Sequence, residues 1–188
     1  RDKAYIYFLK NYFVNAKQYI DEISKLKDND FFAYNIKGLI YLKNNILYEA
    51  KDYFEQAIEI NNKHVDSYNN LGVCLLELEK LNEAYKLFKE AYEIDPDNTK
   101  TLLNLGNVLS LQDNILEAIK IYSKALNLSP NNQEILSNIA ICYCRENKEK
   151  EAKFYYDKAI KINPHDYKLK YAYCTLQLKI NNFTSSWD

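Results

Sequence analysis

Three asparagines, Asn70, Asn104 and Asn138, recur at intervals of 34 residues. A side-chain amide carries two N–H donors and a carbonyl acceptor, so one asparagine can pair with both sides of a peptide bond. A row of such side chains would form a ladder that holds an extended peptide by its backbone. Each hydrogen bond of this kind contributes about 1 kcal/mol net. The chemistry that this spacing indicates is therefore binding.

The residue types that usually carry catalysis or bind metals are few and scattered. The four cysteines lie in apolar helical patterns without a C-x-x-C pair, so we expect buried free thiols in a reducing compartment: Cys74, Cys142, Cys144 and Cys174. His64 and His165 fall in expected loops, where nothing in the sequence pairs with them. No metalloprotease, Ser-His-Asp or glycine-rich phosphate motif is present. We therefore expect no catalytic residue, no metal, no cofactor and no enzymatic activity.

The elements that must position the asparagines repeat with the same 34-residue period. One series is small: Gly38, Gly72 and Gly106, continued by Ala140. Two series are alanines: Ala50, Ala84, Ala118 and Ala152, then Ala57, Ala91, Ala125 and Ala159. An aromatic residue lies between each alanine pair: Phe54, Phe88, Tyr122 and Tyr156. A proline series closes the later units: Pro96, Pro130 and Pro164. Agreement of these series predicts four copies of one structural unit.

Each unit is predicted to be two helices joined by a short turn. In the second unit the first helix shows the i, i+3, i+4, i+7 spacing of one apolar face: Tyr68, Leu71, Gly72 and Leu75. Gly72 and Ala84 are small enough to let the two helices approach closely. The turn position holds Asn45, Glu79, Asp113, Asn147 and Asn181. Asn and Asp tolerate a left-handed backbone, which leaves Glu79 as the exception.

These residues resemble the tetratricopeptide repeat (TPR), whose unit has Leu-Gly at positions 7–8, Ala at 20, an aromatic residue at 24, Ala at 27 and Pro at 32. The resemblance implies an all-α fold, a right-handed α-solenoid of antiparallel helix pairs, and a single array over residues 1–188. Full repeats are expected at 31–64, 65–98, 99–132 and 133–166. A degenerate partial repeat is expected at 1–30, and a terminal helix or a truncated repeat at 167–188.

The resemblance also implies that the first helices line a concave groove, and that positions 2, 5, 6 and 9 of each repeat are among those that face it. These positions supply the candidate peptide-binding residues: Asn35, Leu39, Asn69, Asn70, Val73, Leu103, Asn104, Asn107, Asn138, Ile141, Lys168 and Tyr171. Apolar and amide groups together suit an extended or helical peptide from another protein. The row of asparagines resembles the ladder in the repeats of O-GlcNAc transferases.

A second interpretation of the asparagines stays open. Asn at position 6 is common in the family, including members that bind nothing through it, and Ile36 interrupts the row in the first repeat. A carboxylate clamp for chaperone tails is not expected. In the frame of the first repeat, Asn35 stands where the clamp needs a lysine and Leu39 where it needs an asparagine.

Composition limits the other classes of partner. The net charge of −1 and the pI of about 6.2 give no large basic field, so nucleic-acid binding is disfavoured. No apolar run reaches the roughly 18–20 residues that a bilayer span needs. The chain contains no methionine, so we expect part of a longer protein. The free cysteines favour a cytoplasmic location.

Three functions follow from the pattern. The first is a protein-interaction scaffold that binds a peptide or partner protein in its concave groove. The second is the substrate-recruiting arm of a larger enzyme such as a glycosyltransferase. The third is a scaffold that self-associates end to end through its terminal repeats, because stacked repeats leave an apolar face at each end unless it is capped.

Overall fold

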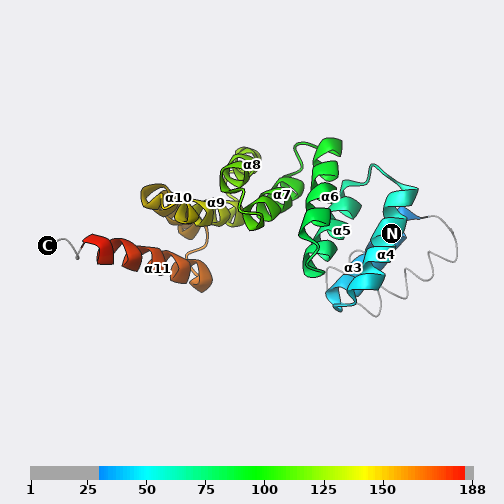
Figure 1. Cartoon of the computed structure of the whole chain (residues 1–188), viewed down its shortest axis with the longest axis horizontal. Helices are drawn as coiled ribbons and strands as arrows, with labels where there is room; N and C mark the ends of the chain where they lie inside the picture. Colours follow the sequence, from blue (N-terminus) through cyan, green and yellow to red (C-terminus); the bar gives the residue numbers. More distant parts are fainter. Residues whose placement is uncertain (1–29, 185–188) are drawn as a thin grey trace. The chain divides into compact units, whose positions relative to one another are not determined.

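The computed structural model describes residues 30–184, with side chains described as far as residue 176. The chain divides into two compact units between Pro96 and Asp97. The first unit contains α3 (Phe31–Lys43), α4 (Leu47–Ile60), α5 (Val65–Glu77) and α6 (Leu81–Ile94). The second contains α7 (Thr99–Leu111), α8 (Ile115–Leu128), α9 (Gln133–Arg145), α10 (Glu149–Ile162) and α11 (Tyr167–Thr184). The described residues contain no strand (Figure 1).

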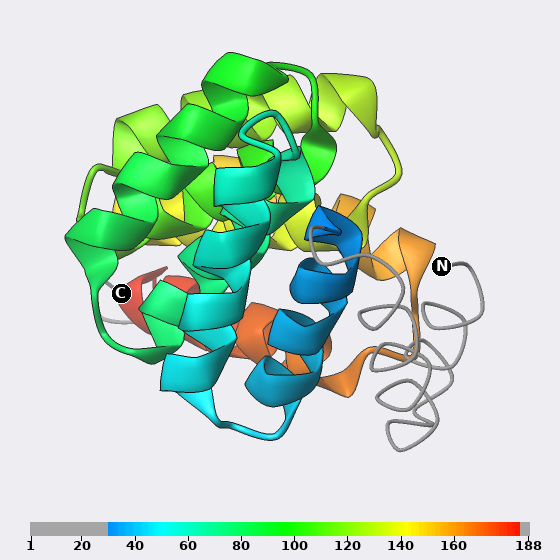
Figure 2. The ribbon, with the colours of Figure 1, turned by 90° about the vertical axis from the view of Figure 1, so that its right-hand side faces the viewer.

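The helices pair into antiparallel hairpins, each with a first helix of 13 residues and a second of 14. In the first unit α3 lies beside α4 and α5 beside α6, and α4 packs against α5 (Figures 1 and 2). In the second unit the hairpins are α7–α8 and α9–α10, and α11 packs against α10. The first helices begin at residues 31, 65, 99 and 133, where the predicted repeats begin. The predicted fold class, an all-α solenoid of helix pairs, is confirmed.

In three of the four hairpins the spacing is set by a glycine that lies against an aromatic ring. A Cβ added to Gly38 would lie only 2.5 Å from Cε1 of Phe54. The same contact joins Gly72 to Phe88 and Gly106 to Tyr122. All three rings are buried, as are the alanines one turn on either side of them on the second helices. The small residues predicted to permit close approach therefore do so, because a side chain on the glycine would occupy the space of the ring.

The turns between paired helices use a left-handed backbone. The residue at the predicted turn position has positive φ in all four hairpins: Asn45 (59°), Glu79 (60°), Asp113 (65°) and Asn147 (56°). The next backbone N–H reaches back to the carbonyl five residues earlier, as Lys80 N does to Leu75 O at 2.8 Å. This pattern satisfies carbonyls at the helix end that would otherwise lack partners. Glu79 adopts the conformation although glutamate gains no local stabilisation there.

Most of the first helices start at a side-chain cap. Asp30, Asn98 and Asn132 each accept a hydrogen bond from a backbone N–H in the first turn that follows. Asp166 accepts from Leu169 N at 3.0 Å in the same way. Because that N–H stabilises the carboxylate, the pKa of Asp166 lies below its ordinary value. These caps fix the start of each first helix and hence the register of its face.

The C-terminal helix lacks the turn that the repeat pattern predicts at Asn181. α11 continues through Asn181, where the repeat alignment placed a turn, and ends at Thr184. In the other repeats a second helix packs against the first and holds the turn. No second helix follows α11 within the described residues. The predicted partial repeat at 1–30 lies, apart from residue 30, outside the described residues.

Gly72→Leu should lower the free energy of unfolding by about 1–3 kcal/mol or more, because the new side chain must displace the Phe88 ring. Urea denaturation measures the change. Val73→Leu is the matched control, because the neighbouring residue is half-buried and away from that ring. Equal stabilities for the two variants would contradict the assigned close approach.

Glu79→Gly should raise the free energy of unfolding by up to about 1 kcal/mol, since glycine adopts positive φ without the steric cost that glutamate bears. The same exchange at Lys80, whose φ is −91°, should lower the melting temperature instead. Thermal unfolding followed by circular dichroism distinguishes the two. A destabilised Glu79→Gly variant would show that the glutamate side chain has a role of its own.

Candidate peptide-binding groove

In the first unit, the predicted groove asparagines form a buried polar cluster between two first helices. Asn70 Nδ2 of α5 donates to Asn35 Oδ1 of α3 at 3.0 Å, and Ser67 Oγ donates to the same oxygen at 3.3 Å. Asn35 and Asn70 are each 5% exposed, while Ser67 and Asn69 are fully buried. The Asn70 amide therefore joins neighbouring repeats. In this conformation it is covered rather than presented at a surface.

His64 belongs to the same cluster, contrary to the expectation that nothing pairs with it. Its Nδ1 lies 2.8 Å from Ser67 Oγ, and its ring lies 4.8 Å from that of Phe31. The sequence spacing i, i+3 across the helix start brings the imidazole to the hydroxyl. Since Ser67 is fully buried, this contact does not make it an accessible nucleophile. The cluster is an internal hydrogen-bonded network.

In the second unit, the asparagines meet a tyrosine hydroxyl. Asn138 Nδ2 of α9 donates to Asn107 Oδ1 of α7 at 2.9 Å. Tyr122 on α8 donates its hydroxyl to the same oxygen at 2.6 Å. Burial raises the pKa of Tyr122 above its ordinary value, so the hydroxyl stays protonated and acts as a donor at neutral pH. One amide oxygen thus ties three helices together.

The other predicted groove residues differ in their exposure. Ile141, Lys168 and Tyr171 are exposed, with Ile141 at 43% and Tyr171 at 74%. Four more are half-buried: Leu39, Val73, Leu103 and Asn104. The accessible part of the predicted set therefore lies mainly on α9 and α11. On α9, Asn138 and Ile141 are three residues apart and share a face.

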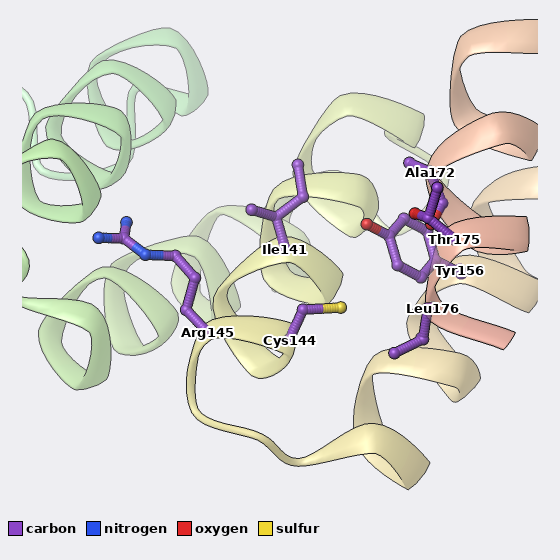
Figure 3. Close-up of a pocket in the computed structure, with 7 residues that line it drawn as sticks. All are labelled: Ile141, Cys144, Arg145, Tyr156, Ala172, Thr175 and Leu176. Atoms are coloured by element: carbon purple, nitrogen blue, oxygen red, sulfur yellow. The ribbon is translucent and has the colours of Figure 1, made fainter. Parts of the chain in front are cut away.

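A pocket of about 400 Å³ opens beside Ile141 in the second unit. It is lined by Ile141, Cys144, Arg145, Tyr156, Ala172, Thr175 and Leu176 (Figure 3). Figure 3 shows the Tyr156 hydroxyl pointing toward Ile141 and the Arg145 guanidinium pointing away from the tyrosine. Of these residues the sequence pattern indicated Ile141 alone. A break in the repeat was the available signal, because Ala172 stands at position 6, where three earlier repeats have asparagine.

Arg145 connects the end of α9 to the end of α7. One guanidinium nitrogen donates to Ser110 O at 2.6 Å and to Ser110 Oγ at 3.0 Å. The other guanidinium nitrogen forms an ion pair with Asp113 Oδ1 at 2.8 Å. The pair is exposed, so its charge attraction contributes little to stability. The contacts nevertheless direct the guanidinium toward α7 and leave the side-chain stem along the pocket.

The cysteines are all free thiols, but they are not all buried. Cys74 and Cys142 are buried as expected, and burial raises the pKa of Cys74 to about 11. Cys144 is half-buried and Cys174 is exposed, so the expectation of burial is wrong for these two. Cys174 occupies position 8 of α11, the position that faces the paired helix in other repeats. No paired helix follows within the described residues.

The described residues can also be considered for metal binding and for membrane spans. No group of three or more His, Cys, Asp or Glu side chains in them is arranged to hold a metal ion. Among the described helices, none combines the length and apolar character needed to cross a membrane.

Comparison with family models identifies the repeats. Models of the tetratricopeptide repeat match residues 33–64, 65–98 and 98–164. Together they span residues 33–164, which is more than half of the 188-residue chain. The chain therefore belongs to the tetratricopeptide repeat family. A search of curated proteins finds no match.

Solved structures share the fold. YrrB, described as a TPR protein with an unusual peptide-binding site, is 24% identical with a TM-score of 0.72, over 90% of this chain and 87% of YrrB. A thermophilic TPR protein of Thermus thermophilus is 20% identical with a TM-score of 0.77, over 94% and 96%. PilF of Pseudomonas aeruginosa is 17% identical with a TM-score of 0.82, over 97% and 89%. At these identities the likeness shows the fold alone.

Asn70→Ala should cost about 1–3 kcal/mol of stability, because it removes a donor from a buried cluster. Asn138→Ala should cost less, about 0.5–1.5 kcal/mol, because Asn138 is half-buried whereas Asn70 is buried. Urea denaturation of both variants measures the difference. An Asn70→Ala variant as stable as the unaltered chain would contradict a structural role for this amide.

Proposed function

We propose that the chain is a protein-interaction module that binds a peptide segment of another protein along its first helices. In the second unit the binding surface is defined by α9 and α11, with Asn138, Ile141, Lys168 and Tyr171 as its contact residues. Half-buried Asn104 and Asn138 are the candidates of the asparagine ladder for pairing with a peptide backbone. A helical or an extended peptide would suit a surface of this composition.

One observation carries the proposal: exposed apolar and aromatic side chains lie on the first helices beside a pocket. Ile141 is 43% exposed and borders the pocket, and Tyr171 is 74% exposed next to Ala172 of the pocket wall. Aromatic residues rimmed by polar groups are frequent anchors in protein interfaces. Lys168, one turn before Ala172 on α11, adds a cation that can orient a partner.

Family membership supports the same function. TPR proteins are repeat proteins whose stacked helices create extended binding surfaces. YrrB, which shares the fold, has a peptide-binding site according to its description. The side chains that would recognise the partner here are nevertheless those of this chain, and they have to be tested directly.

Capture of a partner from source-cell lysate by the immobilised chain should be lost in the double variant Ile141→Asp, Tyr171→Ser. The substitutions remove the apolar anchors and introduce a charge, while both positions are exposed and tolerate polar residues. Mass spectrometry compares the proteins that each variant retains.

Phe154→Ser is the matched control for this capture. Phe154 is an aromatic residue of similar exposure, 53%, but it lies on the second helix α10, where Lys158 Nζ covers its ring at 4.2 Å. A protein retained by the unaltered chain and by Phe154→Ser but not by the double variant is the expected result. A protein lost only with Phe154→Ser would place the binding surface on the second helices and refute the proposal.

A further inference from the structure

Each residue that lines the pocket has a counterpart 34 residues earlier. The lining residues are Ile141, Cys144, Arg145, Tyr156, Ala172, Thr175 and Leu176. Their counterparts are Asn107, Ser110, Leu111, Tyr122, Asn138, Ile141 and Cys142. The pocket can therefore be compared with the equivalent position one repeat earlier in the same unit, which has asparagine side chains where the pocket has none.

One repeat earlier, the side chains of Asn107 and Asn138 connect the helices around the equivalent position. Asn138 donates to Asn107 Oδ1 at 2.9 Å, and the Tyr122 hydroxyl donates to the same oxygen at 2.6 Å. At the pocket, Ala172 replaces the first asparagine and Ile141 replaces the second. Both amide groups are thus missing at this place, and Ala172 at position 6 lines the pocket.

The pocket has a tyrosine at the position that Tyr122 occupies one repeat earlier. Tyr156 occupies the position of Tyr122, and its hydroxyl points toward Ile141 (Figure 3). Burial raises the pKa of Tyr156 above its ordinary value, so the hydroxyl is a donor at neutral pH. After burial, the nearby Cys144 thiol also contributes to this raised pKa through a hydrogen bond. Sulfur is a weak partner, so a carbonyl oxygen that reached the hydroxyl would be the better acceptor.

The other walls favour a neutral ligand group with an apolar stem. Ile141, Ala172 and Leu176 are aliphatic, and Thr175 adds a hydroxyl whose proton is directed to Ala172 O at 2.7 Å. Arg145, the cation of the pocket wall, is engaged with Ser110 and Asp113 on the side of α7. A carboxylate placed here would lose hydration without gaining a charged partner, which is costly. A side-chain amide loses less and supplies the missing carbonyl.

We propose that this pocket binds the side-chain amide of a glutamine or asparagine in the partner peptide, with its carbonyl accepting a hydrogen bond from the Tyr156 hydroxyl. The methylene stem of the ligand packs against Ile141 and Leu176. The ligand thereby supplies the group that Asn138 supplies one repeat earlier. The inference rests on the proposed function, because it names what the same first-helix surface recognises.

Short peptides titrated into the full chain test this specificity. The probes are acetylated and amidated Ser-Gly-Xaa-Gly-Ser peptides in which Xaa is glutamine, asparagine, leucine, glutamate or lysine. The methyl resonances of Ile141 and Ala172 report on the pocket by NMR. We expect the glutamine or the asparagine peptide to shift both resonances and to bind more tightly than the other three.

Three variants connect the shifts to the tyrosine and to the missing amide. Tyr156→Phe should weaken binding of the amide peptides by about two- to tenfold, the effect of one hydrogen bond. Tyr122→Phe is the matched control and should leave peptide affinity unchanged, because that hydroxyl is already bonded to Asn107. Ala172→Asn should abolish binding, because the new amide fills the place that the ligand would take.

Several results would overturn the inference. They are a leucine or glutamate peptide that binds at least as well as the amide peptides, the absence of any shift at millimolar peptide, and unchanged binding in Ala172→Asn. The proposed function fails separately. If Ala172→Asn still captures the lysate partner that the double variant at Ile141 and Tyr171 loses, the pocket inference is wrong and the peptide-binding surface stands.

Discussion

The structure depends on the contact, in three of the four hairpins, between a glycine of the first helix and the aromatic ring of the paired second helix. Gly38, Gly72 and Gly106 lie so close to their rings that a Cβ would overlap them. The contact involves the largest fully buried side chain of each of these hairpins and fixes how far apart the two helices run. It also fixes which face of the first helix is left over, since the side facing the ring is fully occupied. In the fourth hairpin Ala140 takes the glycine position opposite Tyr156, and both residues remain buried.

The asparagines on the remaining face have two kinds of role, and burial separates them. Asn35 and Asn70 lie inside a satisfied hydrogen-bond network, where their side chains join α3 to α5. In the second unit the Asn107 side-chain oxygen accepts hydrogen bonds from α8 and α9. Asn138 is half-buried, and Ile141 one turn later is exposed. No buried side-chain nitrogen or oxygen among the described residues lacks a partner, so the networks are complete without a ligand. In the next repeat Ile141 and Ala172 replace the two asparagines, and both line a pocket.

Much of the fold follows from the sequence because one 34-residue pattern is repeated and each copy confirms the others. The helix starts and the close approach of the helices at the glycines could be predicted, and even Glu79 adopts the left-handed turn that its position requires. The hydrogen bonds of Asn70 and His64 could not, because they depend on side-chain rotamers and on the exact fit of neighbouring repeats. The course of α11 through Asn181 and the exposure of Cys174 could not be predicted either. At both positions the repeat pattern predicts what the other hairpins have, a turn at 181 and a buried small residue at 174, and α11 differs from them.

In the proposed function, the second helices build the scaffold and the first helices present the surface that a partner contacts. Site-specific photocrosslinking tests it most directly, with p-benzoylphenylalanine placed at Tyr171 on α11 in one sample and at Phe154 on α10 in another. Both side chains are aromatic and more than half exposed, at 74% and 53%, so the crosslinker should not disturb the second unit, which contains both positions. The account predicts a covalent adduct with the partner from position 171 and none from position 154. An adduct from position 154 alone would contradict it.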